Sequence, residues 1–358
     1  MARNKRCKPL LNHVCPICCI LPPHMNDQIV LNGDSTQKEW ALQSIRASEQ
    51  FRERRTIVGA LNLNAAFNLA TVGEKRRTIF DASTGTDLPG KRVRGEGDPP
   101  TGDVMVDEAY DGSGATYDFF YDIFERNSID GLGMRLDSTV HFDQKYDNAF
   151  WNGSQMVYGD GDGELFNRFT ISIDIIGHEL THGVTQHEAG LVYKGQPGAL
   201  NESMSDVFGS LIKQRTLNQT AEEADWLIGA GLLTDKVDGT ALRSMKAPGT
   251  AYDDKVLGKD PQPADMSKIY TGKADNEGVH INSGIPNRAF YLAASEMGGY
   301  AWEKAGKIWY IALCDRLRSQ SNFKRAANLT VTIAGELYGP DSAEKKAVEK
   351  AWKTVGVV

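Results

Sequence analysis

The stretch ISIDIIGHELTHGVTQH, residues 171–187, combines a helical pattern with two closely spaced histidines. Isoleucines at helical spacing precede the pentapeptide HELTH, residues 178–182. Histidines four positions apart on a helix are separated by about 400° of rotation, so both imidazoles leave one face, one turn apart. His178 and His182 can therefore bind one Zn²⁺, and Glu179 can reach the water that the metal activates.

A third ligand is needed to distinguish a catalytic site from a chance HELTH on a solvated helix. The segment NESMSD, residues 201–206, begins the next predicted helix, and Glu202 follows His182 by twenty positions. Glu202 can complete a His₂Glu site with one position open for water, as in catalytic rather than structural zinc sites. Asp206, one turn later, can accept the second N–H of one ligating histidine, and Asn201 can do the same for the other.

Bulk composition narrows the class of protein. The chain has 358 residues, so two or three structural units are expected. Its formal net charge of −7 gives no support for a nucleic-acid partner. No segment approaches the roughly 18 apolar residues of a membrane-spanning helix. Four of the five cysteines lie in the first twenty residues, so the body of the chain cannot be a disulfide framework.

The texture of the chain changes near Thr78 and again after Phe169. Between these points short apolar runs alternate with Gly, Asp and Pro, residues 111–114 are expected to form a turn, and a helix is expected from Tyr117 to Ser128. A β-rich half followed by an α-rich half predicts an α+β fold of two lobes, with the zinc site in the cleft between them. The helices expected after Phe169 and the 171–187 segment cover residues 200–215, 289–297, 304–317, 323–337 and 342–355.

Three further motifs accompany HELTH and NESMSD in the chain: NAFWNG at 148–153, GLVY at 190–193 and GVHINSG at 278–284. Together the five motifs resemble those of the thermolysin family of metallopeptidases, and the resemblance runs from about Thr78 to the end of the chain. It implies a thermolysin-like two-lobed fold and a zinc-dependent neutral endopeptidase. It also implies hydrolysis of peptide bonds that precede bulky hydrophobic residues.

The resemblance assigns an expected role to each matching position. His178, His182 and Glu202 would bind the one catalytic zinc, and Glu179 would take the proton from the zinc-bound water. The other expected site residues are His280 and Tyr193 for the oxyanion, Asp275 to orient His280, Asn148, Ala149 and Arg243 for the substrate backbone, and Phe166, Phe169, Ile175 and Leu242 for the main specificity pocket.

The N-terminal residues are basic and rich in Cys and Pro, unlike the rest of the chain. The segment CCILPPHM, residues 18–25, resembles the short propeptide of the protealysin subgroup, which is marked by a Pro-Pro-hydrophobic element. The resemblance implies an inhibitory propeptide over residues 1–70, a β-rich catalytic lobe including the zinc-ligand helix over 71–189, and an α-helical lobe over 190–358. The expected inhibitory residues are Cys18, Cys19, Pro22, Pro23 and His24, of which Cys18, Cys19 or His24 would approach the open position of the zinc.

Two features of the propeptide stay open. Cys15 and Cys18 form a C-x-x-C pair that could be half of a structural zinc site or a redox pair, but no second pair accompanies it. The maturation site is expected between Thr56 and Arg77, because the texture of the catalytic domain begins after Arg77.

Calcium binding is where the chain departs from the family pattern. The prototype has a paired calcium site built from several carboxylates, and Asp174 and Asp225 fall at matching positions. Lys213, Leu227 and Ala230 stand where further acidic ligands would be needed. A lysine replaces a ligand with a positive charge, so at most one calcium ion is expected.

Location and partners follow from the same features. Residues 10–21 lack the uninterrupted apolar run and small-residue cleavage site of a conventional signal peptide. Secretion is nevertheless favoured, with a cytoplasmic precursor as the alternative. The expected partners are protein or peptide substrates of a monomeric enzyme, and a protein inhibitor is left open. An aminopeptidase and an inactive binding protein with the same fold are the competing functions.

Overall fold

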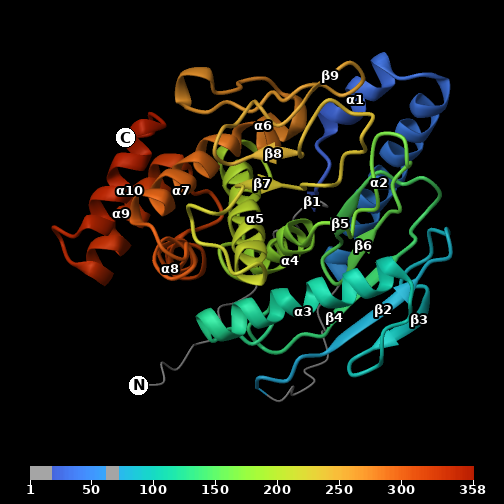
Figure 1. The fold of residues 1–358 in the computed structure, drawn as a ribbon, viewed down its shortest axis with the longest axis horizontal. Coiled ribbons are helices and arrows are strands. Elements are labelled where there is room, and N and C mark those ends of the chain that lie inside the picture. Colours follow the sequence, from blue (N-terminus) through green and yellow to red (C-terminus); the bar gives the residue numbers. More distant parts are fainter. Residues whose placement is uncertain (1–17, 62–71) are drawn as a thin grey trace.

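The computed structural model describes the backbone of residues 18–61 and 72–358, and the side chains of residues 19–48 and 72–358. Cys15 and the side chain of Cys18 lie outside this part, as do residues 62–71 of the expected maturation window and the side chains of residues 56–61. A β-sheet region and a mainly helical region flank two central helices (Figure 1). This arrangement confirms the predicted α+β fold with a β-rich first half. No helix in the described part is long and apolar enough to cross a membrane.

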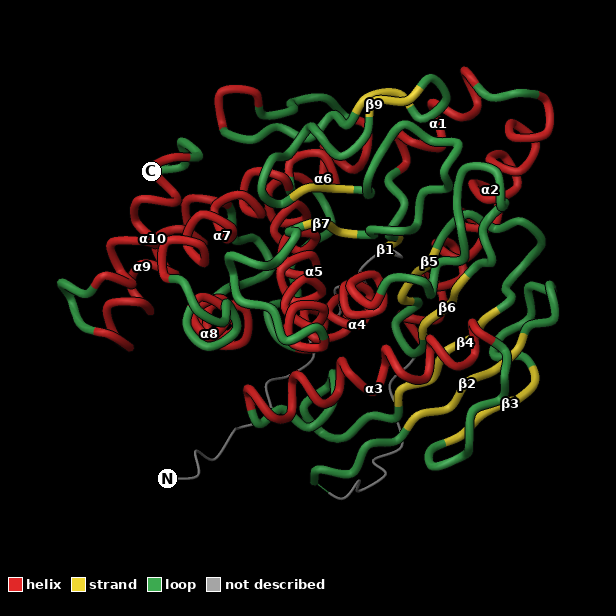
Figure 2. The backbone as a smooth tube through the Cα atoms, viewed as in Figure 1, coloured by secondary structure: helices red, strands yellow, loops and turns green. Residues whose placement is uncertain are grey.

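A twisted six-stranded sheet forms the N-terminal region (Figure 2). Its strand order is β1-β5-β6-β4-β2-β3, with parallel pairing only between β2 and β4 and between β4 and β6. At one edge, β1 from the N-terminal segment pairs antiparallel with β5, so that Cys18 faces Trp151 and Cys19 faces Phe150. The strands are β1 (Cys18–Cys19), β2 (Arg77–Asp81), β3 (Lys91–Gly95), β4 (Leu136–Val140), β5 (Ala149–Trp151) and β6 (Met156–Tyr158).

Helix α3 (Val104–Phe124) packs between this sheet and the central helices. Asp103 caps its first turn by accepting from the backbone N–H groups of Met105 and Val106. The turn predicted at residues 111–114 is therefore wrong, as is the predicted start of the helix at Tyr117. The small residues at 112–114 allow close packing against the helix that carries Ile176. A Cβ added to Gly112 would lie 2.4 Å from a methyl group of Ile176.

The two central helices, α4 (Ile173–His187) and α5 (Gly195–Thr216), are buried along most of their length. Their backbones approach closely at two glycines. A Cβ on Gly177 would lie 3.2 Å from the Cα of Gly209, and a Cβ on Gly209 would lie 2.5 Å from the carbonyl oxygen of Asp174. The absence of side chains at these positions lets the polar residues of both helices meet. NESMSD lies inside α5 rather than at its start, because the helix begins at Gly195.

The remaining helices confirm the predicted helical second half. They pack on α5 and on one another, with α10 against α7 and α9 (Figure 1). Two short two-stranded sheets lie between α5 and α6 in the chain, and one of them includes the predicted substrate-binding residue Arg243. These elements are β7 (Leu227–Ile228), β8 (Arg243–Ser244), β9 (Asp253–Asp254), β10 (Gly258–Lys259), α6 (Ala274–Asn282), α7 (Gly284–Met297), α8 (Ala305–Ile311), the π-helix η2 (Ala312–Arg316), α9 (Phe323–Tyr338) and α10 (Ala343–Thr354), with a short 3₁₀ turn η1 (Met266–Lys268) before α6.

The N-terminal segment after β1 forms two helices, α1 (Pro23–Asn32) and α2 (Ser35–Leu61). Pro22, with an extended backbone, precedes α1, and Pro23 occupies its first turn, where a missing N–H costs nothing. The proline pair therefore ends the extended segment and begins the helix. Helix α2 lies against residues 143–147, where Ser48 hydrogen-bonds the Tyr146 hydroxyl at 2.9 Å.

Candidate metal centre and substrate-binding site

Three buried side chains from the central helices form the only group of possible metal ligands in the described part of the chain. His178 and His182 come from α4 and Glu202 from α5, and one ligand atom of each lies within 4.8 Å of the others. The two histidine Nε2 atoms are 3.0 Å apart. Each Nε2 is 3.5 Å from an oxygen of Glu202. The sequence-predicted ligands thus converge on one point.

The second ring nitrogen of each histidine is held by a residue of α5. His178 Nδ1 donates to Asp206 Oδ1 at 2.8 Å, and His182 Nδ1 donates to Asn201 Oδ1 at 2.9 Å. Because Nδ1 carries the hydrogen in both rings, each Nε2 presents a lone pair toward the shared point. Asp206 and Asn201 therefore lie where the sequence predicted them.

The residues present fit a zinc ion on the evidence of two orphaned oxygens. Glu179 Oε1 and Glu202 Oε2 are fully buried without a hydrogen-bond partner, a costly arrangement for carboxylates unless a cation or water completes it. Glu179 Oε2 accepts from the Trp151 backbone N–H at 3.0 Å, so Oε1 is the oxygen of this carboxylate that keeps no hydrogen-bond partner. Two imidazoles and a carboxylate are a donor set that zinc prefers.

Burial and neighbouring charges set the protonation of these acids. Burial, followed by the nearby Glu202 carboxylate, raises the pKa of Glu179 well above its ordinary value. Burial alone would also raise the pKa of Glu202, but His280, His182 and His178 outweigh it and lower that pKa. A basic carboxylate beside an ionised ligand is the arrangement that a proton-accepting role requires.

A third imidazole, that of His280 on α6, faces the metal ligands. His280 Nδ1 is 2.5 Å from Asp275 Oδ1, and the Asp275 carboxylate also accepts from the backbone N–H of His280. Burial would lower the pKa of His280, but Asp275 and Glu202 outweigh it and raise the pKa to about 9. Tyr193 OH lies 3.0 Å from His280 Nε2 and donates to Glu202 Oε1. Two donors thus converge beside the metal ligands.

The residues expected to hold a substrate backbone line the same region. Asn148 and Ala149 lie at the start of β5, the strand that pairs with β1. Arg243 lies on β8 and is held by Asp206, with contacts of 3.0 Å from Nε and 2.9 Å from the terminal nitrogen. Asp206 therefore connects a metal ligand to a predicted substrate-binding residue.

The four residues predicted to form the specificity pocket are all at most 1% exposed. The rings of Phe166 and Phe169 lie 6.0 Å apart. Ile175 and Leu242 come together at Gly229, where an added Cβ would lie within 3.5 Å of both. All four belong to the main hydrophobic core, which is also compatible with a purely structural role.

Asn287 is a site residue that sequence reasoning missed. Its side-chain amide donates to Asp206 Oδ2 at 2.7 Å from α7, and the residue is fully buried. It lies outside all five motifs, so only its distance of three residues beyond GVHINSG connected it with the site.

Comparisons with known proteins agree with this geometry. The model of the thermolysin metallopeptidase catalytic domain matches residues 60–186, and the model of the thermolysin metallopeptidase alpha-helical domain matches residues 189–357. The chain belongs to the thermolysin family. Members of this family are zinc metalloendopeptidases, as the cluster of His178, His182 and Glu202 requires.

Two full-length relatives and one solved structure support this membership. An extracellular metalloprotease of Pectobacterium carotovorum subsp. carotovorum is 51% identical, covering 96% of this chain and 97% of the relative. Protease PrtS of Photorhabdus sp. (strain Az29) is 47% identical, covering 94% and 91%. The precursor of protealysin from Serratia proteamaculans is 54% identical with a TM-score of 0.87, covering 95% of this chain and all of that structure. This thermolysin-family chain spans about half of a 42% identical bacillolysin from Brevibacillus brevis.

The prediction that Cys18, Cys19 or His24 approaches the open position of the zinc stays a prediction, and the side chain of Cys18 lies outside the described residues. Neither Cys19 nor His24 joins the group of ligand atoms in the described part of the chain. The Cys19 side chain is buried with Phe142 and Phe150. His24 Nε2 lies 3.0 Å from the hydroxyl of Tyr252. The group of Cys19 that contacts His280 is its carbonyl oxygen, which accepts from Nε2 at 3.0 Å.

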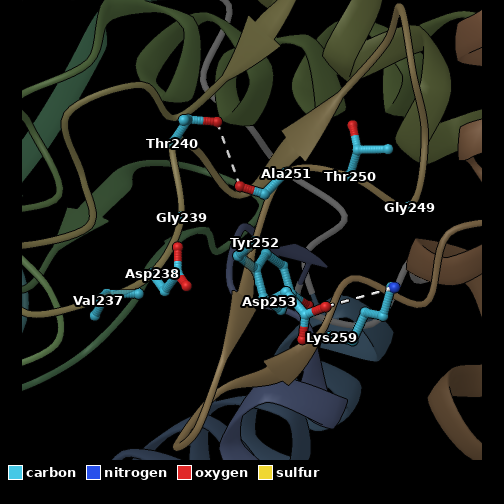
Figure 3. Close-up of a pocket in the computed structure, with 10 residues that line it drawn as sticks. All are labelled: Val237, Asp238, Gly239, Thr240, Gly249, Thr250, Ala251, Tyr252, Asp253 and Lys259. Atoms are coloured by element: carbon cyan, nitrogen blue, oxygen red, sulfur yellow. Dashed lines mark hydrogen bonds and ion pairs between the residues drawn. The ribbon is translucent and has the colours of Figure 1, made fainter.

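Tyr252 also borders a hollow of about 470 Å³ beside the N-terminal helices (Figure 3). Its polar lining comes from residues 237–240 and 249–253 with Lys259, and includes none of the metal ligands. Asn32 Nδ2 at the end of α1 reaches the carbonyl oxygen of Val256 at 3.4 Å nearby. The hollow therefore lies next to the docked segment and outside the zinc site.

Lys213 supplies a cation beside Asp174 and Asp225, the two acids that the resemblance matched to calcium ligands. Its Nζ lies 2.9 Å from Asp174 Oδ2, 2.9 Å from Asp225 Oδ1 and 2.8 Å from the carbonyl oxygen of Leu227. Asp174 and Lys213 are buried, whereas Asp225 is 43% exposed. The ammonium group therefore lies between the two carboxylates with oxygen neighbours from three residues, and the expectation of at most one calcium ion stays a prediction.

Proposed function

We propose that this zinc metalloendopeptidase cleaves peptide bonds that precede bulky hydrophobic residues and that residues 1–70 are its inhibitory propeptide. One observation carries the proposal: residues 19–21 lie along β5 and contact the predicted substrate-binding residues. Arg243 donates to the carbonyl oxygen of Ile20 at 3.2 Å, and Asn148 Oδ1 accepts from the backbone N–H of Leu21 at 3.0 Å. These contacts support a substrate-like position of the N-terminal segment in the proposed site.

His178, His182 and Glu202 would hold the zinc, which when bound would supply Lewis-acid activation of water and of the scissile carbonyl. Glu179 Oε1 accepts the proton of the attacking water, a role that fits a buried carboxylate whose pKa is raised above its ordinary value by burial and by Glu202. The same carboxyl group then gives the proton to the departing amine. Burial of Glu179 excludes bulk water, which keeps this proton transfer within the site.

His280 and Tyr193 stabilise the negative charge that develops on the carbonyl oxygen. A pKa of about 9 keeps His280 protonated at neutral pH, so that Nε2–H donates to this oxygen. Asp275 holds the ring in place through Nδ1. The Tyr193 hydroxyl, beside Nε2, is the second donor.

The substrate preference rests on the apolar surroundings of the site. Phe166, Phe169, Ile175 and Leu242 are proposed to receive the side chain that follows the cleaved bond. Burial of a large apolar side chain contributes about 1.5–3 kcal/mol, which a polar side chain cannot gain. A blocked peptide library cleaved without preference for bulky apolar residues at this position would contradict the assignment. Cleavage only of peptides with a free amino terminus would instead indicate an aminopeptidase.

The division of the chain and its location belong to the same proposal. Residues 71–189 and 190–358 form the two catalytic lobes, and the enzyme acts as a monomer. Secretion is supported by the name of the Pectobacterium relative, an extracellular metalloprotease. A precursor state is supported by the similarity to the protealysin precursor over nearly the whole chain.

The test is the intact mass of full-length protein over time at neutral pH with added zinc. We expect the wild type to lose its N-terminus up to a point between Thr56 and Arg77, whereas Glu179→Gln stays whole. Glu164→Gln is the matched control, because Glu164 is an exposed acid in a surface ion pair with Lys236. Loss of the N-terminus from Glu179→Gln in the absence of another protease would exclude Glu179 as the base.

A further inference from the structure

Residues Cys19 to Leu21 lie in one definite register along β5. β1 runs antiparallel to β5, and the Ile20 N–H donates to the Ala149 carbonyl oxygen at 3.1 Å. The next N–H, that of Leu21, donates to Asn148 Oδ1. Each main-chain group on the site side of this segment is therefore paired, as for a peptide bound by strand addition.

The carbonyl of Cys19 is the one that faces the catalytic groups. Its oxygen accepts from His280 Nε2 at 3.0 Å, and the same nitrogen lies 3.0 Å from the Tyr193 hydroxyl and 3.7 Å from Glu202 Oε2. The following carbonyl, that of Ile20, is held instead by Arg243. Only the Cys19–Ile20 bond therefore lies between the oxyanion donors and the groups that hold the residue after the cleaved bond.

We propose that Cys19–Ile20 is a self-cleavage site: the zinc-loaded precursor hydrolyses this bond of its own N-terminal segment. The inference rests on the proposed function and deepens it by assigning a substrate sequence and its register. Water adds to the Cys19 carbonyl carbon, the C–N bond breaks, Cys19 ends in a carboxylate, and Ile20 receives a proton and becomes a new amino terminus.

The side chains agree with this register. Ile20, the residue after the bond, is bulky, apolar and fully buried, as is Leu21. Pro22 then turns the chain away into α1 and has no N–H to continue the strand. The extended segment therefore presents a single bond with a hydrophobic residue on its amine side to the catalytic groups.

Cleavage here differs from removal of the whole propeptide. It separates β1 from α1 and α2 while the contacts of α2 remain, among them Gln43 with Asp143 at 2.9 Å and Ser44 with the Asp147 N–H at 3.2 Å. The cut removes the covalent link that holds the Cys19 carbonyl on His280. Cleavage at Cys19–Ile20 therefore weakens the block on the site before maturation between Thr56 and Arg77.

The test follows zinc-loaded full-length protein under reducing conditions by intact mass and N-terminal sequencing. We expect a fragment that ends at Cys19 and a new terminus at Ile20, absent from Glu179→Gln. Ile20→Asp places a charge in an apolar site and should slow this cleavage at least about 100-fold. Ile20→Leu is the matched control and should retain it. A cut one residue earlier or later would overturn the register.

A second measurement does not depend on activity. In full-length Glu179→Gln, hydrogen exchange should be slow at the Ile20 and Leu21 amides, and at least tenfold faster in the double variant with Ile20→Asp. Fast exchange in Glu179→Gln alone would overturn the docked register.

A blocked peptide with a bulky apolar residue, added to the same preparation after maturation, separates the two proposals. Cleavage of that peptide with an intact Cys19–Ile20 bond throughout overturns the self-cleavage site alone. Failure to cleave either one overturns the proposed function and the self-cleavage site with it.

Discussion

The α4–α5 helix pair holds two buried clusters of charged side chains, and the negative charge of the buried carboxylates is balanced differently in each. At one level, His178 and His182 of α4 meet Glu202 of α5, and buried carboxylate oxygens are left without partners. One turn before His178 on α4, Asp174 meets Lys213 of α5, and the ammonium lies among oxygens of Asp174, Asp225 and Leu227. The first cluster needs a cation from outside, whereas the second carries its own.

This difference shows what makes a metal site in a close-packed helix pair. Glycines at the crossing bring the backbones together, so polar side chains of both helices meet out of water in either cluster. A buried carboxylate then requires a positive partner. Lys213 provides one for Asp174 within the chain, whereas Glu179 Oε1 and Glu202 Oε2 keep no hydrogen-bond partner although His280 lies nearby. A metal is needed only where the chain leaves its carboxylates unpaired.

The largest expected effect comes from removing a zinc ligand. Glu202→Gln keeps the shape of the side chain but replaces an anionic ligand with a neutral amide. We expect zinc affinity to fall by more than about 100-fold, because even residues that only support a ligand contribute 10–100-fold. Competition with a chelator measures this loss, and unchanged affinity would show that Glu202 is not a ligand.

Removing the internal cation should affect folding rather than catalysis. Lys213→Met leaves Asp174 buried without a positive partner, at a cost of about 3–5 kcal/mol in the free energy of unfolding. Urea denaturation measures this loss of stability. The Lys213 pKa is raised, despite burial, by Asp174 and Asp225, so its contribution is full below pH 10.5 and is lost as the pH rises further.

Asp225→Asn provides the matched control for Lys213. Its carboxylate is partly exposed, so its loss should cost at most about 1 kcal/mol. Excess calcium should stabilise the wild type less than it stabilises Lys213→Met. Equal stabilisation of the two proteins would show that the Lys213 ammonium does not occupy the place of a cation, and would contradict the contrast between the two clusters.

A residue that supports a ligand should show an intermediate effect. Asn287→Leu removes the amide that donates to Asp206 Oδ2 at similar side-chain volume. We expect zinc affinity to fall by about 10–100-fold, since Asp206 orients the His178 ring. A loss of stability with unchanged zinc affinity would assign Asn287 to packing alone.

His24 adds a third case to the comparison of buried clusters, because this buried imidazole stays neutral instead of forming an ion pair. Burial lowers its pKa to about 4, helped by His280 and Arg243 and opposed by Asp275. A lowered pKa means that docking is strongest above the ordinary value of 6.5 and weakens as the pH falls toward 4. At about pH 5 the docking equilibrium should fall roughly 30-fold.

Hydrogen exchange at the Ile20 and Leu21 amides of Glu179→Gln, corrected for the intrinsic effect of pH, measures this docking. His24→Gln in the same background can still hydrogen-bond Tyr252 but does not titrate, so its docking should not change between about pH 7 and pH 5. An equal pH response in both proteins would assign the change to another group.

Much of the site could be predicted because its residues occur in short sequence motifs with regular spacing. HELTH predicts its own geometry, since four residues are one turn of helix, and Glu202 and Asp206 stand one turn apart on the next helix. Lys213 among acidic positions likewise predicted a site with an internal cation. The turn expected at residues 111–114 failed because small residues also allow helices to pack closely, as Gly112 does against Ile176.

The sequence by itself determined the family, the zinc ligands and the helical second half, and it predicted Glu179 as the base, because each depends on residue type and short spacing. Tertiary structure alone decided that Asn287 supports Asp206, that the Cys19 carbonyl rather than its thiol faces His280, and that Cys19–Ile20 is the bond in position. The physical reason is that these contacts join residues far apart in the chain through backbone groups that every residue carries. Only the packing of β1 on β5 selects which of those groups meets the catalytic side chains.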